Sequence, residues 1–297
     1  MRSITKYMDG WDIAQEVRIE RKVHKGSFLL LEGETDYKRM LKFLDEQACS
    51  VAICFGRSNL EEAMELLEDE GFPGVVGLAD ADFDRCGGGV PTALDNVIYS
   101  EFHDFDVDWM TDDVVDQYLT EFADKQKCVS IGGTSQIIDL IMIKLEPLSV
   151  LRPLNHQGAI KMKLSEVDIS ASYNGSNIDI PMLVSSISRG ANAEPAARSA
   201  LENRIIAEMG AGKNWKQFTN GHDMCGMLGL MLRNEIGSRR DSNTYDREVA
   251  SHIRLTYSAV EFCKSHLSRE LGQWQANNQP YIVIAINCNA VRNMAVN

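Results

Sequence analysis

Apolar and polar positions alternate in short blocks over the first hundred residues, and these blocks predict an α/β fold. Four apolar runs have the length of buried strands: SFLLLEG at 27–33, SVAICF at 50–55, GVVGLAD at 74–80 and NVIYSEF at 96–102. The stretch after the first run has apolar residues at helical spacing, at positions 37, 40, 41 and 44. Strands that alternate with helices predict a parallel sheet with helices on its faces.

The second predicted helix, GRSNLEEAMELLEDEG at 56–71, carries signals for both of its ends. Ser58 followed by Glu61 three residues later has the form of a capping box, so we predict that Ser58 is the N-cap. Gly71 is the residue expected just past the C-terminus of the helix. The glycine-rich stretch CGGGVPTALD at 86–95 then predicts a loop.

After about residue 110 the pattern changes to helical periodicity. Helices are predicted at 112–125, 134–152, 178–190, 195–210 and 222–237. The run QPYIVIAINCNAV at 279–291 fits either a late strand or a packed helix. We therefore predict a sheet domain over residues 20–125, followed by a mostly α-helical C-terminal region over 126–297 for substrate, dimer or partner contacts.

Charge is distributed unevenly between these two regions. Residues 1–125 contain 12 Lys and Arg against 28 Asp and Glu, a net charge of −16, whereas residues 126–297 contain 18 against 15, a net charge of +3. The acidic region should repel nucleic acid unless bound cations offset its charge, and the later region can contact phosphate. Its basic positions, which equally fit a solvated face, are Arg189, Arg198, Arg204, Lys213, Lys216, Arg233, Arg239, Arg240, Arg247 and Arg254.

Composition points to a cytoplasmic protein outside the membrane. The chain has no run of about 18 apolar residues, which excludes a simple membrane span, and its first residues lack the apolar core of a secretory signal. Seven cysteines, an odd number, occur without a C-x-x-C pair. This pattern argues against a zinc ribbon and a disulfide framework, and fits a reducing compartment.

Acidic residues stand where the predicted strands end. Glu32 follows the first strand, and Asp80 and Asp82 follow the third. In an open parallel sheet, sites form beyond the carboxyl ends of the strands, so these side chains should converge if the strands are neighbours. Asp36, four residues after Glu32, falls in the first turn of the next helix, and Asp84 continues the spacing of Asp80 and Asp82.

Such a group of carboxylates predicts a divalent metal. Clustered carboxylates repel one another unless a cation neutralises them, and hard oxygen ligands suit Mg²⁺ or Mn²⁺. These ions serve phosphoryl chemistry because they polarise the phosphate, activate a water molecule and stabilise the leaving oxygen. We predict Glu32, Asp80 and Asp82 as catalytic residues, and the metal ligands as Glu32, Asp36, Asp80, Asp82 and Asp84.

The order strand, Glu-Gly, helix, strand, helix, strand, Asp-x-Asp resembles the Toprim fold of topoisomerases, primases and several nucleases. FLLLEGETDYKRM and VVGLADADFD resemble the two acidic motifs of Toprim nucleases of the overcoming-lysogenization-defect type. SEFHDFDVDWM at 100–110 and TNGHDMCGM at 219–227 resemble motifs of a Toprim-containing bacterial defence family whose members are encoded beside an ABC-type ATPase. Within this family the chain most resembles the nuclease subunits of the phage anti-restriction-induced system (PARIS). Asp106 stands where that family has glutamate.

The resemblance implies an anti-phage effector, a toxin kept silent by its ABC-type ATPase partner. It implies a magnesium-dependent endoribonuclease that cleaves transfer RNA when released, so that translation stops. It also implies a homodimer in the active form. The residues themselves support a metal and a phosphodiester.

Four further residues are candidates for positioning substrate. Arg57 lies at the start of the second predicted helix and could meet phosphate, although Ser58 capping also explains its stretch. His103 and Asp104 lie just past the fourth predicted strand, where a structural histidine is an equal alternative. His222 lies in NGHD at 220–223, which also fits a helix entry capped by Asn220 or Asp223. Trp215 and Phe218 could stack on bases or fill a core.

Three other functions compete with this hypothesis. A haloacid-dehalogenase-like phosphatase also uses a strand-end Asp-x-Asp, but normally after its first strand, whereas Asp80 comes about 50 residues after the first strand. A DNA-nicking Toprim enzyme fits the same acidic residues. A docking subunit without catalysis would be free to lose its repulsive carboxylates, and this chain retains them.

Overall fold

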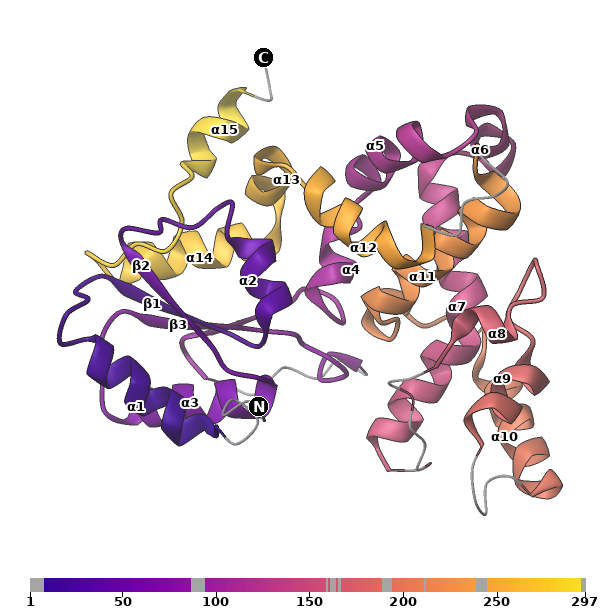
Figure 1. Ribbon diagram of the computed structural model, residues 1–297, viewed down its shortest axis with the longest axis horizontal. Helices are drawn as coiled ribbons and strands as arrows, with labels where there is room; N and C mark the ends of the chain where they lie inside the picture. Colours follow the sequence, from indigo (N-terminus) through magenta and orange to yellow (C-terminus); the bar gives the residue numbers. More distant parts are fainter. Residues whose placement is uncertain are drawn as a thin grey trace, which may run out of the picture. The chain divides into compact units, whose positions relative to one another are not determined.

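We analysed a computed structural model of the chain, which describes residues 8–86, 94–158, 160, 164, 167–188, 194–210, 212–238 and 245–294. The chain forms two compact units (Figure 1). Of the described residues, the first unit takes 8–84, 94–101 and 257–294, and the second takes 85–86 and those between 102 and 256. This division differs from the predicted one at 125/126, because the chain returns to the sheet unit after the helical unit is complete. Part of the predicted loop at 86–95 lies outside the described residues.

The first unit is a four-stranded, all-parallel sheet with helices on both faces. Its strands are β1 (Ser27–Leu31), β2 (Cys49–Ile53), β3 (Val75–Ala79) and β4 (Val97–Tyr99), in the order β2-β1-β3-β4. Its helices are α1 (Gly10–Glu20), α2 (Glu34–Met40), α3 (Arg57–Asp69), α13 (Ala259–Lys264), α14 (His266–Asn277) and α15 (Cys288–Met294). The predicted α/β class, the parallel sheet and the positions of all four strands are confirmed.

Burial explains why the central strands are continuous apolar runs. Every residue of β1 and β3 is buried, as expected for strands covered on both faces. The core on one face joins α1 and α3 to β1, with Ile13, Leu60 and Phe28 fully buried. Helices α2 and α14 lie on the other face (Figure 1).

Helix α3 ends as predicted and begins differently. Phe72 N–H donates to the Leu67 carbonyl and Gly71 N–H to that of Glu68, and Gly71 has φ +62°, which together form a Schellman motif. At its start the N-cap is Gly56, and Ser58 lies inside the first turn. The predicted Ser58 capping box is therefore wrong, because the tight turn from β2 leads into the helix two residues earlier.

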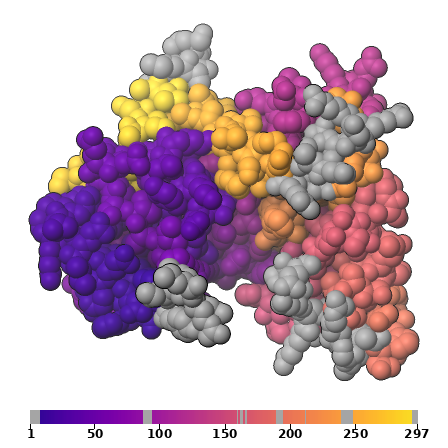
Figure 2. Space-filling view, in the orientation of Figure 1, coloured from indigo at the N-terminus to yellow at the C-terminus, as the bar shows by residue number. Residues whose placement is uncertain are grey.

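The run at 279–291 is neither a strand of the sheet nor a single helix. Residues 282–285 are extended beside the segment before β2: Asp45 N–H donates to the Val283 carbonyl over 2.9 Å, and Ala285 N–H donates to the Phe43 carbonyl over 3.0 Å. Figure 2 shows the C-terminal part of this unit, in yellow, beside its N-terminal part in indigo and purple. Cys263 and Cys288 form a disulfide, contrary to the expectation drawn from cysteine spacing.

The second unit consists of helices and their connections, with no β-strand among its described residues. Its elements are α4 (Phe105–Trp109), α5 (Asp112–Phe122), α6 (Lys125–Ile131), α7 (Thr134–His156), α8 (Ile169–Ser172), α9 (Ile180–Ile187), α10 (Pro195–Glu208), the 3₁₀ turn η5 (Trp215–Gln217), α11 (Gly221–Met231), the π-helical turn η6 (Leu232–Ile236) and α12 (Tyr245–Thr256). The five helices predicted after residue 110 are all present. No single helix in the described chain is long and apolar enough to cross a membrane, and α6 and α7 meet at a bend of 69°.

Candidate functional site

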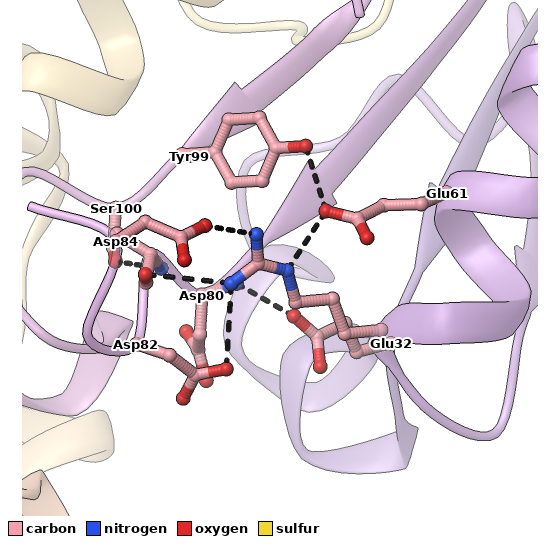
Figure 3. A network of polar contacts seen from close by, with 9 residues as sticks. Glu32, Glu61, Asp80, Asp82, Asp84, Tyr99 and Ser100 are labelled. Carbon is pink, nitrogen blue, oxygen red and sulfur yellow. Dashed lines mark hydrogen bonds and ion pairs between the residues drawn. The ribbon is translucent and has the colours of Figure 1, made fainter. Parts of the chain in front are cut away.

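The carboxyl ends of β1 and β3 bring the predicted acidic residues together (Figure 3). These strands are direct neighbours, and Leu31 pairs with Leu78, so Glu32 and Asp80 leave the sheet side by side. One Glu32 carboxylate oxygen accepts the Asp80 backbone N–H over 2.6 Å. The two strand ends therefore lie together, as strand order predicted, and the bond between them joins the Glu32 side chain to the Asp80 backbone.

Asp36 is held by its own helix. It lies in the first turn of α2, as predicted, where its carboxylate accepts the Gly33 N–H over 3.1 Å and pairs with the buried Arg39 over 2.5 Å. This position also suits the positive end of a helix dipole. Asp36 thus fixes the turn that follows Glu32, and its charge acts on Glu32 from nearby.

The backbone is strained on both sides of Glu32. Asp82 has φ +47° and Phe55 has φ +57°, conformations that residues other than glycine rarely adopt. The strand end beside Asp82 is fixed, because Ala81 N–H donates to the Ser100 hydroxyl over 2.8 Å. Phe55, by contrast, is 44% exposed. Such strain persists only where the surrounding structure enforces it, and it is typical of functional sites.

Arg57 lies at the centre of the acidic group and takes part in what we call the Arg57 network: Arg57, Glu61, Asp82, Asp84 and Tyr99. Its Nε donates to Glu61 over 2.8 Å, one terminal nitrogen pairs with Asp84, and the other lies 3.5 Å from Asp82. The guanidinium also lies over the Tyr99 ring, 5.1 Å from its centre, and the Tyr99 hydroxyl donates to Glu61 over 2.9 Å.

Burial and charge shift the protonation of this site. The pKa of Glu32 is raised to about 7, mainly by desolvation and also by the charges of Asp36 and Asp82, while the Asp80 N–H and Arg57 act against this rise. Burial opposes the charge on Arg57, but its hydrogen bonds to Asp84 and Glu61 prevail and raise its pKa. Glu32 therefore exchanges a proton near neutral pH while the guanidinium beside it stays charged.

The donor set suits a hard divalent cation, although the side chains are not gathered around one point. Carboxylate oxygens from two adjacent strand ends are the ligands that Mg²⁺ and Mn²⁺ prefer. Among the described residues, however, no three Asp, Glu, His or Cys side chains are grouped closely enough to hold a metal ion. Asp82 and Asp84 are turned toward Arg57 instead. The residues fit the cation in chemistry, and a cation bound here would compete with Arg57 for Asp82.

His103, Asp104 and His222 belong to the second unit. Asp104 is the N-cap of α4, where it accepts the Val107 N–H over 2.8 Å, and its second oxygen accepts the Gly221 N–H at the start of α11 over 2.7 Å. Burial raises its pKa. The two later sequence motifs thus meet at one carboxylate that joins two helices.

The histidines beside that joint have different surroundings. His103 is buried, and its backbone N–H donates to the backbone carbonyl of Lys216 over 3.0 Å. His222 is exposed, and its N–H is capped by the Asn220 side chain over 2.9 Å, so the predicted Asn220 cap is confirmed. Asp223 is instead buried and paired with Arg152 over 2.6 Å.

Several of the basic positions bond within the chain. Arg204 and Lys213 both pair with Glu208, and Arg254 lies 4.0 Å from Asp106. Lys213 also lies over the rings of Trp215 and Phe218, which contact each other edge to face. Arg189, Arg239 and Arg240 lie outside the described residues, as does the side chain of Arg247.

Sequence reasoning missed three members of the site: Glu61, Tyr99 and Ser100. Glu61 had a usable signal, since it lies four residues after Arg57 on a predicted helix, where opposite charges pair. Tyr99 ends β4 and Ser100 follows it, and only the sheet order brings them next to β3. No protein-family model matches this chain, and no curated protein sequence matches it.

Proposed function

We propose that this protein is a metal-dependent nuclease of the Toprim type. The observation that carries the proposal is the pair of adjacent strand ends where Glu32 accepts the Asp80 N–H over 2.6 Å, with Asp82 in the same group of carboxylates. In enzymes with an open parallel sheet, ligands bind beyond the carboxyl ends of the strands, and this acidic group lies at that place.

Each residue has a definite task in this proposal. Glu32, Asp80 and Asp82 would hold Mg²⁺ or Mn²⁺, with Asp36 and Asp84 as further candidate ligands. The bound cation would polarise the phosphate and stabilise the leaving oxygen. Glu32 has a pKa of about 7 without a bound cation, and where Asp80 and Asp82 hold the metal it is suited to take or give a proton at neutral pH.

Arg57 would then change partners. A guanidinium released from Asp82 presents planar donors that match phosphate oxygens in pairs. Arg57 is therefore proposed to hold the scissile phosphate once the cation has taken Asp82. Its bond to Glu61 keeps the side chain at the site during that exchange.

The sequence resemblance extends the proposal to substrate and partners. By that resemblance the substrate is RNA, specifically transfer RNA, and the protein is an anti-phage effector of the PARIS type. An ABC-type ATPase would hold it silent in the cytoplasm, and release would yield an active homodimer. These parts of the proposal rest on the motifs at 28–40, 75–84, 100–110 and 219–227.

The decisive experiment is cleavage of total cellular RNA and of plasmid DNA by the purified protein, with Mg²⁺, with Mn²⁺ and with EDTA. Glu32→Gln should abolish cleavage, because it removes the proton-exchanging group and a metal ligand. Glu34→Gln is the matched control, since Glu34 is an exposed carboxylate two residues away. Loss of one transfer RNA species supports the full proposal. DNA nicking with intact RNA supports a DNA-directed Toprim enzyme.

A docking subunit without catalysis is a second candidate, and the Arg57 network favours it. In this arrangement Arg57 already neutralises Asp82 and Asp84 without a metal. If Glu32→Gln keeps the full cellular effect of the wild-type protein beside its ATPase, the docking function is correct. If the variant loses that effect while still binding the ATPase, the nuclease is correct.

A further inference from the structure

The outer edge of the sheet is an open backbone ladder. Strand β2 is the last strand on its side. Cys54 N–H donates to the Leu31 carbonyl, and the Ala48 carbonyl accepts the Ser27 N–H. The backbone N–H and C=O groups of the even-numbered residues in β2 therefore point toward β1. Backbone groups alternate along a strand, and those of Val51 and Ile53 therefore point away from the sheet. Within the described residues, neither of these two N–H groups has a backbone partner.

A groove runs along this edge, with a volume of about 410 Å³. The edge groove is lined by Glu20, His24, Tyr37, Leu44, Glu46 and the β2 residues Cys49, Ser50, Val51 and Ile53. The end of α1 borders it through Glu20, whose carboxylate accepts the Ser50 hydroxyl over 2.5 Å. Strand β2, CSVAI, contains no charged residue and no proline, the devices that usually keep an edge strand from pairing.

The charge around the edge groove selects its partner. Its described lining contains two glutamates and no lysine or arginine. The acidic border continues along α1, where Asp12, Glu16 and Glu20 line a second hollow. A second copy of this chain would pair the same edge with itself about a two-fold axis and bring these carboxylates face to face. A basic segment would be attracted to them.

We propose that the edge groove binds an extended, basic segment of another protein as a fifth strand. The main chain of the segment would pair with Val51 and Ile53, and its alternate apolar side chains would contact the groove beside Leu44 and Tyr37. Lysine or arginine side chains would reach Glu20 and Glu46. Strand addition of this kind takes affinity from the backbone and specificity from the side chains. The proposal is independent of the nuclease site.

The test uses two labelled peptides, one with alternating Lys and Val and one with alternating Glu and Val. Fluorescence anisotropy at low salt should show the Lys-Val peptide binding at least about tenfold more tightly, with the difference shrinking at high salt. Glu20→Gln together with Glu46→Gln should remove most of that difference. The amide oxygen introduced by Glu20→Gln can still accept the Ser50 hydroxyl, so the variant isolates charge.

A backbone variant tests the strand geometry. Val51→Pro removes an outward N–H and leaves the ladder to β1 intact, so the protein should fold and lose the peptide. Ala52→Pro, its matched control, removes an inward N–H and should destabilise the sheet. The proposal is overturned if both peptides bind alike, if neither binds, or if Val51→Pro binds as wild type. Self-association that Val51→Pro abolishes would make a second copy the occupant and also overturn it.

Discussion

The two units each contain a central carboxylate, and the two carboxylates are used in opposite ways. Asp104 in the helical unit is buried, and its two oxygens accept backbone N–H groups over 2.8 and 2.7 Å. Asp82, which lies just past the carboxyl end of β3, has a side chain that is 43% exposed, a strained backbone and a contact with Arg57 over 3.5 Å. A carboxylate fully satisfied by backbone stabilises a fold, whereas one held loosely by another side chain can change partners.

The largest expected effect is on cleavage activity at the sheet site, and it is tested at Glu32. Glu32→Gln should lower the cleavage rate by about 10³-fold, within the range expected for loss of an acid–base group. Stability in urea at pH 5, where Glu32 is protonated, should stay near that of wild type, because the amide can still accept the Asp80 N–H. Single-turnover cleavage and urea denaturation of the same preparations measure both. A variant that cleaves normally would remove Glu32 from the chemistry.

The helical unit should respond in the opposite way. Asp104→Ala leaves two backbone N–H groups of helix starts without their acceptor, which should lower the free energy of unfolding by about 3 kcal/mol. His222→Ala, at an exposed position nearby, should change it by less than about 0.5 kcal/mol. Urea denaturation followed by circular dichroism measures both. Equal effects of the two substitutions would show that Asp104 does not join α4 to α11.

The pH dependence of stability sharpens the comparison at Glu32. Its pKa is raised to about 7 in the folded protein from an ordinary value of 4.5, so the folded state binds the proton more tightly than the unfolded state. The contribution of Glu32 is therefore full below about pH 4.5 and is lost as the pH rises through about 7. After allowance for solvent screening, this loss should be about 2 kcal/mol.

Denaturation of wild type and Glu32→Gln across this range isolates that contribution, since glutamine does not titrate. The wild-type protein should lose stability relative to the variant as the pH rises from 5 to 8. A constant difference between the two proteins would mean that the pKa of Glu32 is not raised.

The smallest expected effect concerns the start of α3. Ser58→Ala should change the free energy of unfolding by less than about 0.5 kcal/mol, because Ser58 lies inside the first turn and Gly56 is the N-cap. A loss near 1 kcal/mol, typical of a removed cap, would restore the capping box expected from the sequence. Thermal denaturation of both proteins provides the measurement.

Local sequence patterns predicted the sheet well, because they depend on burial along one strand. SFLLL at 27–31 is a short run with four apolar residues, and such a run is stable as a strand that is buried on both faces, as observed. The meeting of the two strand ends at Glu32 and Asp80 followed from strand order and also holds. Arg57 was considered for phosphate, but its bonds to Asp82 and Asp84 depend on how two loops turn, and short-range patterns carry no information about that. The bond between Asp104 and Gly221 joins residues 117 positions apart, and short-range sequence patterns could not predict it either.

The return of the chain to the sheet after residue 257 has a consequence for synthesis. The stacked pair Phe43 and Phe262, and the bonds from residues 43–45 to 283–285, join the earliest part of the chain to a late one. At about 5–20 residues per second, a ribosome needs roughly ten to thirty seconds to pass from β4 to this segment. During that interval the nascent chain already carries every acidic residue of the site on a sheet that lacks part of its cover. The sheet therefore receives its last covering helices only after translation has moved through the whole helical unit.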